Sequence, residues 1–192
     1  MMTVSPSLDT AGGRLARIRL VSRVMAGVTL VPIVAIVAIP AILVALTLLD
    51  PAALDARLLD AVEAPKDGIL TPLTRARVVA LAAVPLLAAL AGFVAVRRLF
   101  LGFARGEVLT PESGARLKRI GIVVAALGPL TIVIRAVASV VVSLPNPPGE
   151  RMLAVGFGSN DVTTVIAGGL LIVLGWTLEE AARIADENRQ FV

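Results

Sequence analysis

The amino-acid sequence predicts an all-α polytopic membrane protein, with four transmembrane helices in one bundle. Of its 192 residues, 57% are hydrophobic and 17% are charged, and the mean hydropathy is +0.92. Soluble domains are about 45–50% apolar and about 25% charged. The apolar residues also gather in four long runs that contain one charge or none. Runs of this length would aggregate in water, so the composition excludes a single soluble domain.

Each of the four runs is long enough to cross a membrane as a helix. A spanning helix needs about 20 apolar residues, with a range of about 17–25. A signal peptide has an apolar core of only about 7–15 residues, so we expect the first run to be an uncleaved anchor. The predicted transmembrane domain covers residues 24–178, between a basic segment at 1–23 and a helical tail at 179–192. Its spans lie at about 24–49, 78–96, 120–144 and 162–178.

The distribution of basic residues predicts the orientation of the four spans. The N-terminal segment, the middle loop 97–119 and the tail hold twelve Lys or Arg, whereas the loops on the other side hold five. Loops rich in Lys and Arg stay in the cytoplasm. We therefore expect a multi-pass protein of the inner (plasma) membrane with both termini cytoplasmic. The basic middle loop then faces an anionic lipid leaflet and needs no nucleic acid to explain it.

The first external loop contains a predicted amphipathic helix. Asp50 and Pro51 form a helix-start signal. Apolar residues follow at helical spacing, with charged residues expected on the opposite face: Leu54, Leu58, Leu59 and Val62 against Asp55, Arg57, Asp60 and Glu63. Such a helix is either a lid packed over the bundle or a contact for a partner or ligand, and the lid is favoured because most apolar stripes serve packing.

Helix signals also extend the third and fourth helices beyond the membrane. Thr110 is a suitable N-cap with Pro111 after it, so the third helix is predicted to begin in the cytoplasm. The tail contains no helix breaker, and Glu179 and Arg183 are placed for an i,i+4 ion pair. Ser159, Asn160 and Asp161 are candidate N-caps of the fourth helix. The apolar stretch 152–157 before them is expected to dip into the membrane interface.

These extensions predict a cytoplasmic contact surface that carries both signs of charge. Its expected residues lie on the middle loop, the start of the third helix and the tail: Arg97, Arg98, Arg105, Thr110, Glu112, Arg116, Lys118, Arg119, Glu179, Arg183, Glu187 and Asn188.

Arg135 is the one charge inside a predicted span. A charged residue at this depth costs at least about 2.5–3.5 kcal/mol, so it needs a partner or access to water. Its long side chain can reach outward to Asp161, to a helix-end carbonyl or to lipid phosphate. Alternatively, it contacts an anion or substrate in a water-filled cavity. The prolines inside three spans, at positions 32, 40, 85 and 129, fit broken helices of transporters but are also common in membrane helices generally.

Enzyme chemistry is poorly supported by the sequence. The chain has no Cys, His or Tyr, which removes the thiol nucleophile, the commonest general base and the usual zinc ligand. The sequence also lacks a metal-ligand cluster and a phosphate-binding glycine loop. We therefore expect no enzymatic activity, no cofactor and no metal.

Three motifs resemble one known family. They are Gly106-Glu107-Val108-Leu109-Thr110-Pro111-Glu112, Leu117-Lys118-Arg119-Ile120-Gly121 and Glu187-Asn188-Arg189-Gln190-Phe191-Val192. Together they resemble the bacterial four-span membrane family catalogued as domain of unknown function 2975, over residues 20–192. The resemblance implies a bacterial inner-membrane protein without an assigned activity. Members are often encoded beside a small helix-turn-helix regulator, which implies a regulatory pairing.

The sequence thus favours a non-enzymatic membrane protein that acts through protein or lipid contacts. Its expected partners are the lipid bilayer and either a cytoplasmic regulator protein or a second copy of the chain. The alternative is a small transporter or channel component in which Arg135 faces a polar cavity.

Overall fold

The computed structural model describes residues 7–61, 70–145, 147 and 151–190, and these residues form helices without any strand. The helices are α1 (Ser7–Val28), α2 (Leu30–Leu49), α3 (Pro51–Ala61), α4 (Pro72–Arg105), α5 (Pro111–Ser143) and α6 (Ser159–Gln190). Four stretches of the described chain are long and apolar enough to span a membrane, the first of them formed by α1 and α2 together. The predicted all-α polytopic bundle is therefore confirmed.

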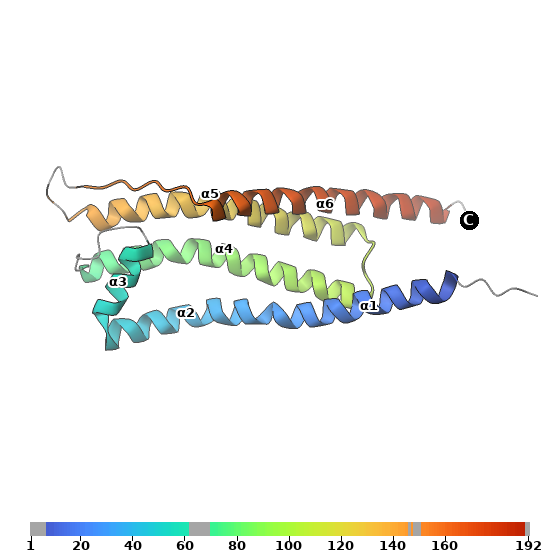
Figure 1. The fold of residues 1–192 in the computed structure, drawn as a ribbon, viewed down its shortest axis with the longest axis horizontal. Coiled ribbons are helices and arrows are strands. Elements are labelled where there is room, and N and C mark those ends of the chain that lie inside the picture. The colour runs from blue at the N-terminus through green and yellow to red at the C-terminus, as the bar shows by residue number, and fades with distance from the viewer. Residues whose placement is uncertain (1–6, 62–69, 146, 148–150, 191–192) are drawn as a thin grey trace, which may run out of the picture.

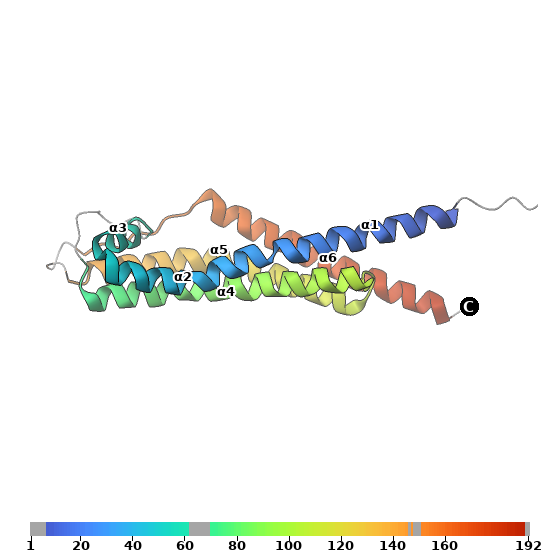
Figure 2. The same cartoon turned by 90° about the horizontal axis from the view of Figure 1, so that it is seen from below.

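The long helices run side by side along one axis (Figure 1). The most extensive contacts join α5 to α6, α4 to α5 and α1 to α4. The start of α1, the loop between α4 and α5, and the end of α6 lie at one end, which we call the terminal end (Figure 1). The short helix α3 lies at the opposite end, which we call the α3 end, and Figure 2 shows the same division from a second direction.

Helix formation starts earlier in the chain than the apolar run alone indicates. Helix α1 begins at Ser7, inside the basic segment, and ends at Val28, four residues before Pro32. Proline lacks the N–H that would bond the carbonyl four residues earlier, so the break lies where Pro32 predicts it. Thr29, at the break, donates a hydrogen bond to the Ala26 carbonyl at 2.9 Å. In contrast, α2, α4 and α5 continue without a break through the other three prolines.

The middle loop is much shorter than the predicted stretch 97–119. Helix α4 runs on to Arg105, where Gly106 adopts a left-handed conformation with φ of 94°. Glycine takes this conformation without steric cost. Thr110 then caps α5 by accepting a hydrogen bond from the Ser113 N–H at 3.2 Å, as predicted. The guanidinium of Arg105, at the end of α4, donates a hydrogen bond to Glu107 in the loop and lowers the pKa of that carboxyl.

Helices α5 and α6 approach closely along a seam of small residues. Glycines recur every seven residues on α5, at 114, 121 and 128, and on α6 at 168 and 175, where the buried Ala182 continues the spacing. Gly114 lies against Gly175, Gly121 against Gly168, and Gly128 against Asp161. A Cβ atom on Gly121 would lie 2.7 Å from the backbone nitrogen of Ile172, and one on Gly168 would overlap the backbone of Ala125. Small residues allow membrane helices to pack at such short separations. The small pair Gly121 and Ala125 thus serves an internal contact.

Helix α3 packs as a lid over the bundle, as the favoured interpretation predicts. Leu54, Leu58 and Leu59 are buried in one cluster with Val78 of α4 and Ala138 of α5. The N-cap at Asp50 is also confirmed, because its carboxylate accepts a hydrogen bond from the Ala53 N–H at 3.0 Å. The predicted positions Val62 and Glu63 lie outside the described residues.

The prediction that Asp55 lies on the solvent face of this helix is wrong. Its side chain is 9% exposed and accepts two hydrogen bonds from Arg75, at 2.7 Å from Nε and 2.8 Å from Nη2. The Leu70 N–H also donates to it, at 3.4 Å. A buried carboxylate is stable only with such partners. The ion pair therefore fastens α3 to the first turn of α4.

We expect Arg75→Leu to release this lid. The chain has no native cysteine, so a single Leu58→Cys substitution gives a unique thiol under α3. Hydrogen bonds to charged groups contribute about 1.5–3 kcal/mol, so alkylation of this thiol should accelerate by about tenfold or more in Arg75→Leu. Arg77→Leu, which removes an exposed charge from the same helix, should leave the rate unchanged. Equal rates in the two variants would contradict the fastening role.

Candidate functional site

The structure brings Arg135 and Asp161 together, the two residues that the sequence pairs as one alternative for the buried charge. Arg135 Nη2 donates to Asp161 Oδ2 at 2.6 Å and to the Gly156 carbonyl at 3.3 Å. The Asp161 side chain is 9% exposed and that of Arg135 30%. Arg135 is thus paired within the protein. Within the described residues, Arg135 donates hydrogen bonds through Nη2. Its Nε atom is buried and has no hydrogen-bond partner among these residues.

Asp161 also organises the first turn of α6. Its Oδ2 accepts a hydrogen bond from the Gly158 N–H at 2.9 Å, and its Oδ1 accepts one from Thr131 at 3.1 Å. The first of these bonds is the carboxylate half of a capping box, in which the third helical residue accepts from the N-cap. Gly158 is therefore the N-cap, whereas Ser159, Asn160 and Asp161 were the predicted candidates and all lie inside α6.

Asp161 lies deep relative to the end of α5. It contacts Thr131 and Arg135, and α5 continues for eight residues beyond Arg135, to Ser143. At 1.5 Å per residue, α6 begins about 12 Å short of the end of α5 that lies at the α3 end of the bundle. The chain covers this distance as an extended segment, residues 151–158, which runs beside α5 (Figure 1).

A polar face of α5 binds this extended segment. Ser143 donates to the Met152 carbonyl at 3.1 Å, and Ser139 accepts from the Ala154 N–H at 3.0 Å. With Arg135 on Gly156, the contacts come from residues 135, 139 and 143, one turn apart. A non-helical backbone at membrane depth requires such partners. The dip of residues 152–157 into the membrane interface stays a prediction. The role of the two serines was not identified from the sequence, although their spacing of four and eight residues from Arg135 places all three on one helix face.

The extended segment presents its other side outward. The side chains that alternate with the bonded residues are the most exposed, namely Leu153, Val155 and Phe157 at 67%, 53% and 78%, whereas Met152 is 48% exposed. Successive side chains of an extended chain point to opposite sides. The segment therefore directs its backbone polar groups to α5 and its apolar side chains away from the protein.

A cavity of about 410 Å³ adjoins the ion pair. Its walls come from α3, α4, α5 and the start of α6, and most of them are apolar. Polar groups lie at one side: Thr131, Arg135, Asn160 and Asp161. A second cavity, of about 380 Å³, shares Pro85, Leu86, Thr131, Asn160 and Asp161 with the first. Arg135 thus lines a cavity, as the alternative interpretation of its charge requires.

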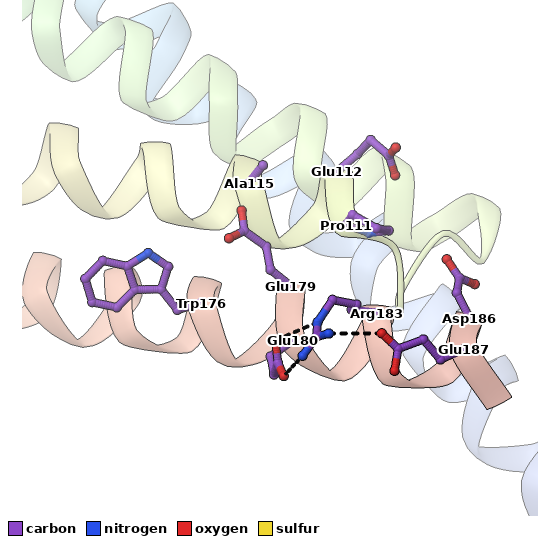
Figure 3. A pocket seen from close by; sticks show the side chains of 9 residues that line it. All are labelled: Pro111, Glu112, Ala115, Trp176, Glu179, Glu180, Arg183, Asp186 and Glu187. Carbon is purple, nitrogen blue, oxygen red and sulfur yellow. Dashed lines mark hydrogen bonds and ion pairs between the residues drawn. The ribbon is translucent and has the colours of Figure 1, made fainter.

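The terminal end gathers most of the predicted contact residues. Lys118 of α5 donates to both carboxylate oxygens of Glu179 on α6, each at 2.9 Å. This bond joins one acid of the tail to the basic start of α5. The predicted pair of Glu179 with Arg183 is wrong, because Arg183 bonds Glu180 and Glu187 instead. Glu179 points to the neighbouring helix, so the cross-helix partner displaces the local one (Figure 3).

An open groove of about 850 Å³ lies between the start of α5 and the tail of α6 (Figure 3). Five carboxylates and one guanidinium line it, beside an exposed tryptophan. Its lining residues are Pro111, Glu112, Ala115, Trp176, Glu179, Glu180, Arg183, Asp186 and Glu187. Four of the twelve predicted contact residues line this groove: Glu112, Glu179, Arg183 and Glu187.

The remaining predicted contact residues lie around the groove or play local roles. Thr110 caps α5, and Asn188 lies in the last turns of α6. The basic residues divide between the last turns of α4, with Arg97, Arg98 and Arg105, and the first turns of α5, with Arg116, Lys118 and Arg119. Arg19 of α1 joins them, although the predicted surface omits it, because its guanidinium packs against Gly106.

The site chemistry consists of ion pairs, hydrogen-bond networks and one acidic groove. Within the described ranges, no group of three or more acidic side chains is arranged to hold a metal ion. No family model, curated protein or solved structure matches the chain. The fold and the site define a polytopic helical membrane protein with a polar cluster near the α3 end and a charged groove at the terminal end.

Proposed function

We propose that this protein is a non-enzymatic membrane protein whose terminal end docks a basic segment of a cytoplasmic regulator protein. The observation that carries the proposal is the groove between α5 and α6, where acidic side chains from two helices surround an open volume of about 850 Å³. In this proposal the terminal end faces the cytoplasm of a bacterial cell, which the excess of Lys and Arg in its segments supports. The resemblance to the domain of unknown function 2975 family supports the same pairing.

The lining of the groove specifies the chemistry of the docked segment. Its five carboxylates outnumber Arg183 and Lys118, the two cations that bond members of this group, so the groove attracts cations. Trp176 is 57% exposed and Ala115 lies beside the groove, so an apolar strip accompanies the acids. A basic amphipathic helix fits both features, with apolar side chains on the tryptophan and Lys or Arg on the carboxylates.

The basic residues around the groove fit a different partner. They lie on the last turns of α4 and the first turns of α5, beside the apolar spans. Lys and Arg at this level are attracted to the anionic headgroups of the cytoplasmic leaflet. In this proposal, lipid contacts fix the depth of the protein, and a protein partner meets the acids of α6 in the groove. There Glu179 is paired with Lys118, and Glu180 and Glu187 share Arg183.

The groove proposal is tested with a designed amphipathic peptide that carries lysine on its polar face and leucine on the other. We expect the purified full chain to bind this peptide and to reject a peptide with glutamate in place of lysine. Binding should weaken at higher salt, because exposed charges are screened. Glu112→Gln with Glu180→Gln should raise Kd by about tenfold, as expected when charge complementarity is removed.

Glu107→Gln is the matched control for this experiment, since Glu107 lies in the loop at the same end but does not line the groove. It should leave peptide binding unchanged. In native membranes, a photo-crosslinker at Ala115 should capture a protein that is lost in the groove variant and retained in the control. Equal loss in both variants, or equal binding of the glutamate peptide, would refute the groove as the docking site.

The alternative, a small transporter or channel component, is favoured by the cavity that Arg135 lines. Transport and docking predict different access of water to this cavity. A transport pathway requires that a membrane-impermeant thiol reagent reach a cysteine at Thr131, whereas docking at the groove does not. Rapid labelling of Thr131→Cys, combined with no crosslinked partner, would replace docking by transport as the proposed function.

A further inference from the structure

The cavities beside the Arg135–Asp161 pair arise because α6 begins late. Helix α4 packs on α5 and α5 packs on α6, but the extended segment replaces the first turns that α6 would need to reach the α3 end. Helix α3 covers the resulting space with Leu58 and Ala61. The two adjoining volumes, about 410 and 380 Å³, each fall within the range of about 300–1,000 Å³ that is typical of ligand sites.

The walls of these cavities select an apolar ligand. Side chains from α3, α4 and α5 contribute methyl and methylene groups: Leu58, Ala61, Val78, Ala82, Pro85, Leu86, Ala89, Leu127, Ile134 and Ala138. An alkyl chain buries its surface against such walls. Three of the helices that line the cavities, α4, α5 and α6, are candidate membrane spans, so a ligand dissolved in the bilayer has a route to them.

The polar end of the cavities selects an uncharged head. Arg135 and Asp161 neutralise each other at 2.6 Å, so the pair offers no net charge to an ion. For either an anionic or a cationic head, attraction by one member of the pair is offset by repulsion from the other. Neither ion therefore recovers the free energy of the hydration that it loses on entering the cavity. Asn160 offers a side-chain amide that both donates and accepts hydrogen bonds. A hydroxyl group matches this mixture, because it also donates and accepts.

We propose that this cavity binds an uncharged single-chain amphiphile with a hydroxylated head, of the monoacylglycerol class, taken from the bilayer. Its chain lies between α4 and α6 under the lid α3, and its head contacts Asn160 beside the ion pair. The site lies near the α3 end, away from the acidic groove at the terminal end. Its test therefore succeeds or fails independently of the docking proposal.

The experiment measures the melting temperature of the purified full chain in detergent against increasing concentrations of three twelve-carbon probes. They are a monoacylglycerol, the carboxylate dodecanoate and a quaternary dodecylammonium. We expect saturable stabilisation by the monoacylglycerol alone. Equal stabilisation by all three would indicate a general detergent effect and would overturn the proposal, as would a response to dodecanoate alone.

Substitutions then locate the site. Ala61→Phe fills the cavity from α3 and should abolish the saturable shift. Ala56→Phe places the same side chain on an exposed position of the same helix, outside the cavity lining, and should retain it. Asn160→Leu should raise the half-saturating concentration by up to about tenfold, the effect of one lost hydrogen bond. An unchanged response in Ala61→Phe, or loss in Ala56→Phe alone, would place the amphiphile elsewhere and overturn the proposal.

Discussion

A single methyl group at Gly168 is expected to destabilise the protein, while the same group at the next residue is not. A Cβ atom at Gly168 would overlap the backbone of Ala125, whereas at Gly169 it would meet nothing within 4 Å. Overpacking of a close contact costs about 1–3 kcal/mol. Alanine is also favoured over glycine within a helix by roughly 0.5–1 kcal/mol, which acts in the stabilising direction at Gly169.

The measurement is the melting temperature of Gly168→Ala and Gly169→Ala in the same detergent. The first should fall and the second should stay equal or rise. Because the two residues are neighbours in one helix, differences in helix propensity and membrane insertion largely cancel. Similar melting temperatures for the two variants would show that α5 and α6 do not form the glycine seam.

Arg135→Leu is expected to destabilise the protein more than Arg183→Leu does. Removing Arg135 leaves the largely buried Asp161 without its charged partner, whereas Arg183 bonds Glu180 and Glu187 at exposed positions. Breaking a buried pair by removing one partner is strongly destabilising, because it leaves an uncompensated charge. Exposed pairs contribute little. The fall in melting temperature should therefore be clear for Arg135→Leu and small for Arg183→Leu.

A double-mutant cycle separates the pairing from other effects of Arg135→Leu. Asp161→Asn removes the stranded charge, and its amide oxygen can still accept the hydrogen bond from the Gly158 N–H. Its amide NH2 then faces the hydroxyl of Thr131, which can accept as well as donate. The double variant should therefore melt higher than Arg135→Leu alone. Additive losses in the cycle would contradict an energetic coupling between the two residues.

The four spans could be predicted because their signals are local. Each apolar run is contiguous in the sequence, and the Thr110 cap and the Pro32 break depend on residues within one turn. The ends of the helices were less predictable. Helix α4 continues through Arg97 and Arg98 because long basic side chains reach water from a helix that has already left the apolar core.

The candidate site depended on contacts that only the fold reveals. Asp55 was predicted on the polar face from its spacing alone, but Arg75, twenty residues later, binds it in the interior. Glu179 likewise bonds Lys118, which is 61 residues away in the chain. The charge of Arg135 alone predicted that this residue needs a partner. The position of Asp161, short of the end of α5, could not be predicted, because it follows from the extended segment that Ser139 and Ser143 bind.

The glycine spacing of α5 and α6 extends to the two residues of the buried ion pair. Arg135 lies seven residues after Gly128, and Asp161 lies seven residues before Gly168, so both continue the glycine spacing of their helices. A repeat of seven keeps residues on one helix face. The seam that joins α5 to α6 therefore also directs the arginine and the aspartate toward each other.

The orientation of the terminal end is the most direct test of the docking proposal, because a cytoplasmic regulator can reach the acidic groove only from the cytoplasm. We expect alkaline phosphatase, which is active only outside the cytoplasm, to be active when fused after Lys66 and inactive when fused after Gly106 or after the C-terminal residue. Green fluorescent protein, which folds in the cytoplasm, should give the reverse pattern at the same three positions. Active phosphatase after Gly106 and at the C-terminus, with an inactive fusion after Lys66, would place the groove on the outer side and contradict the proposed function.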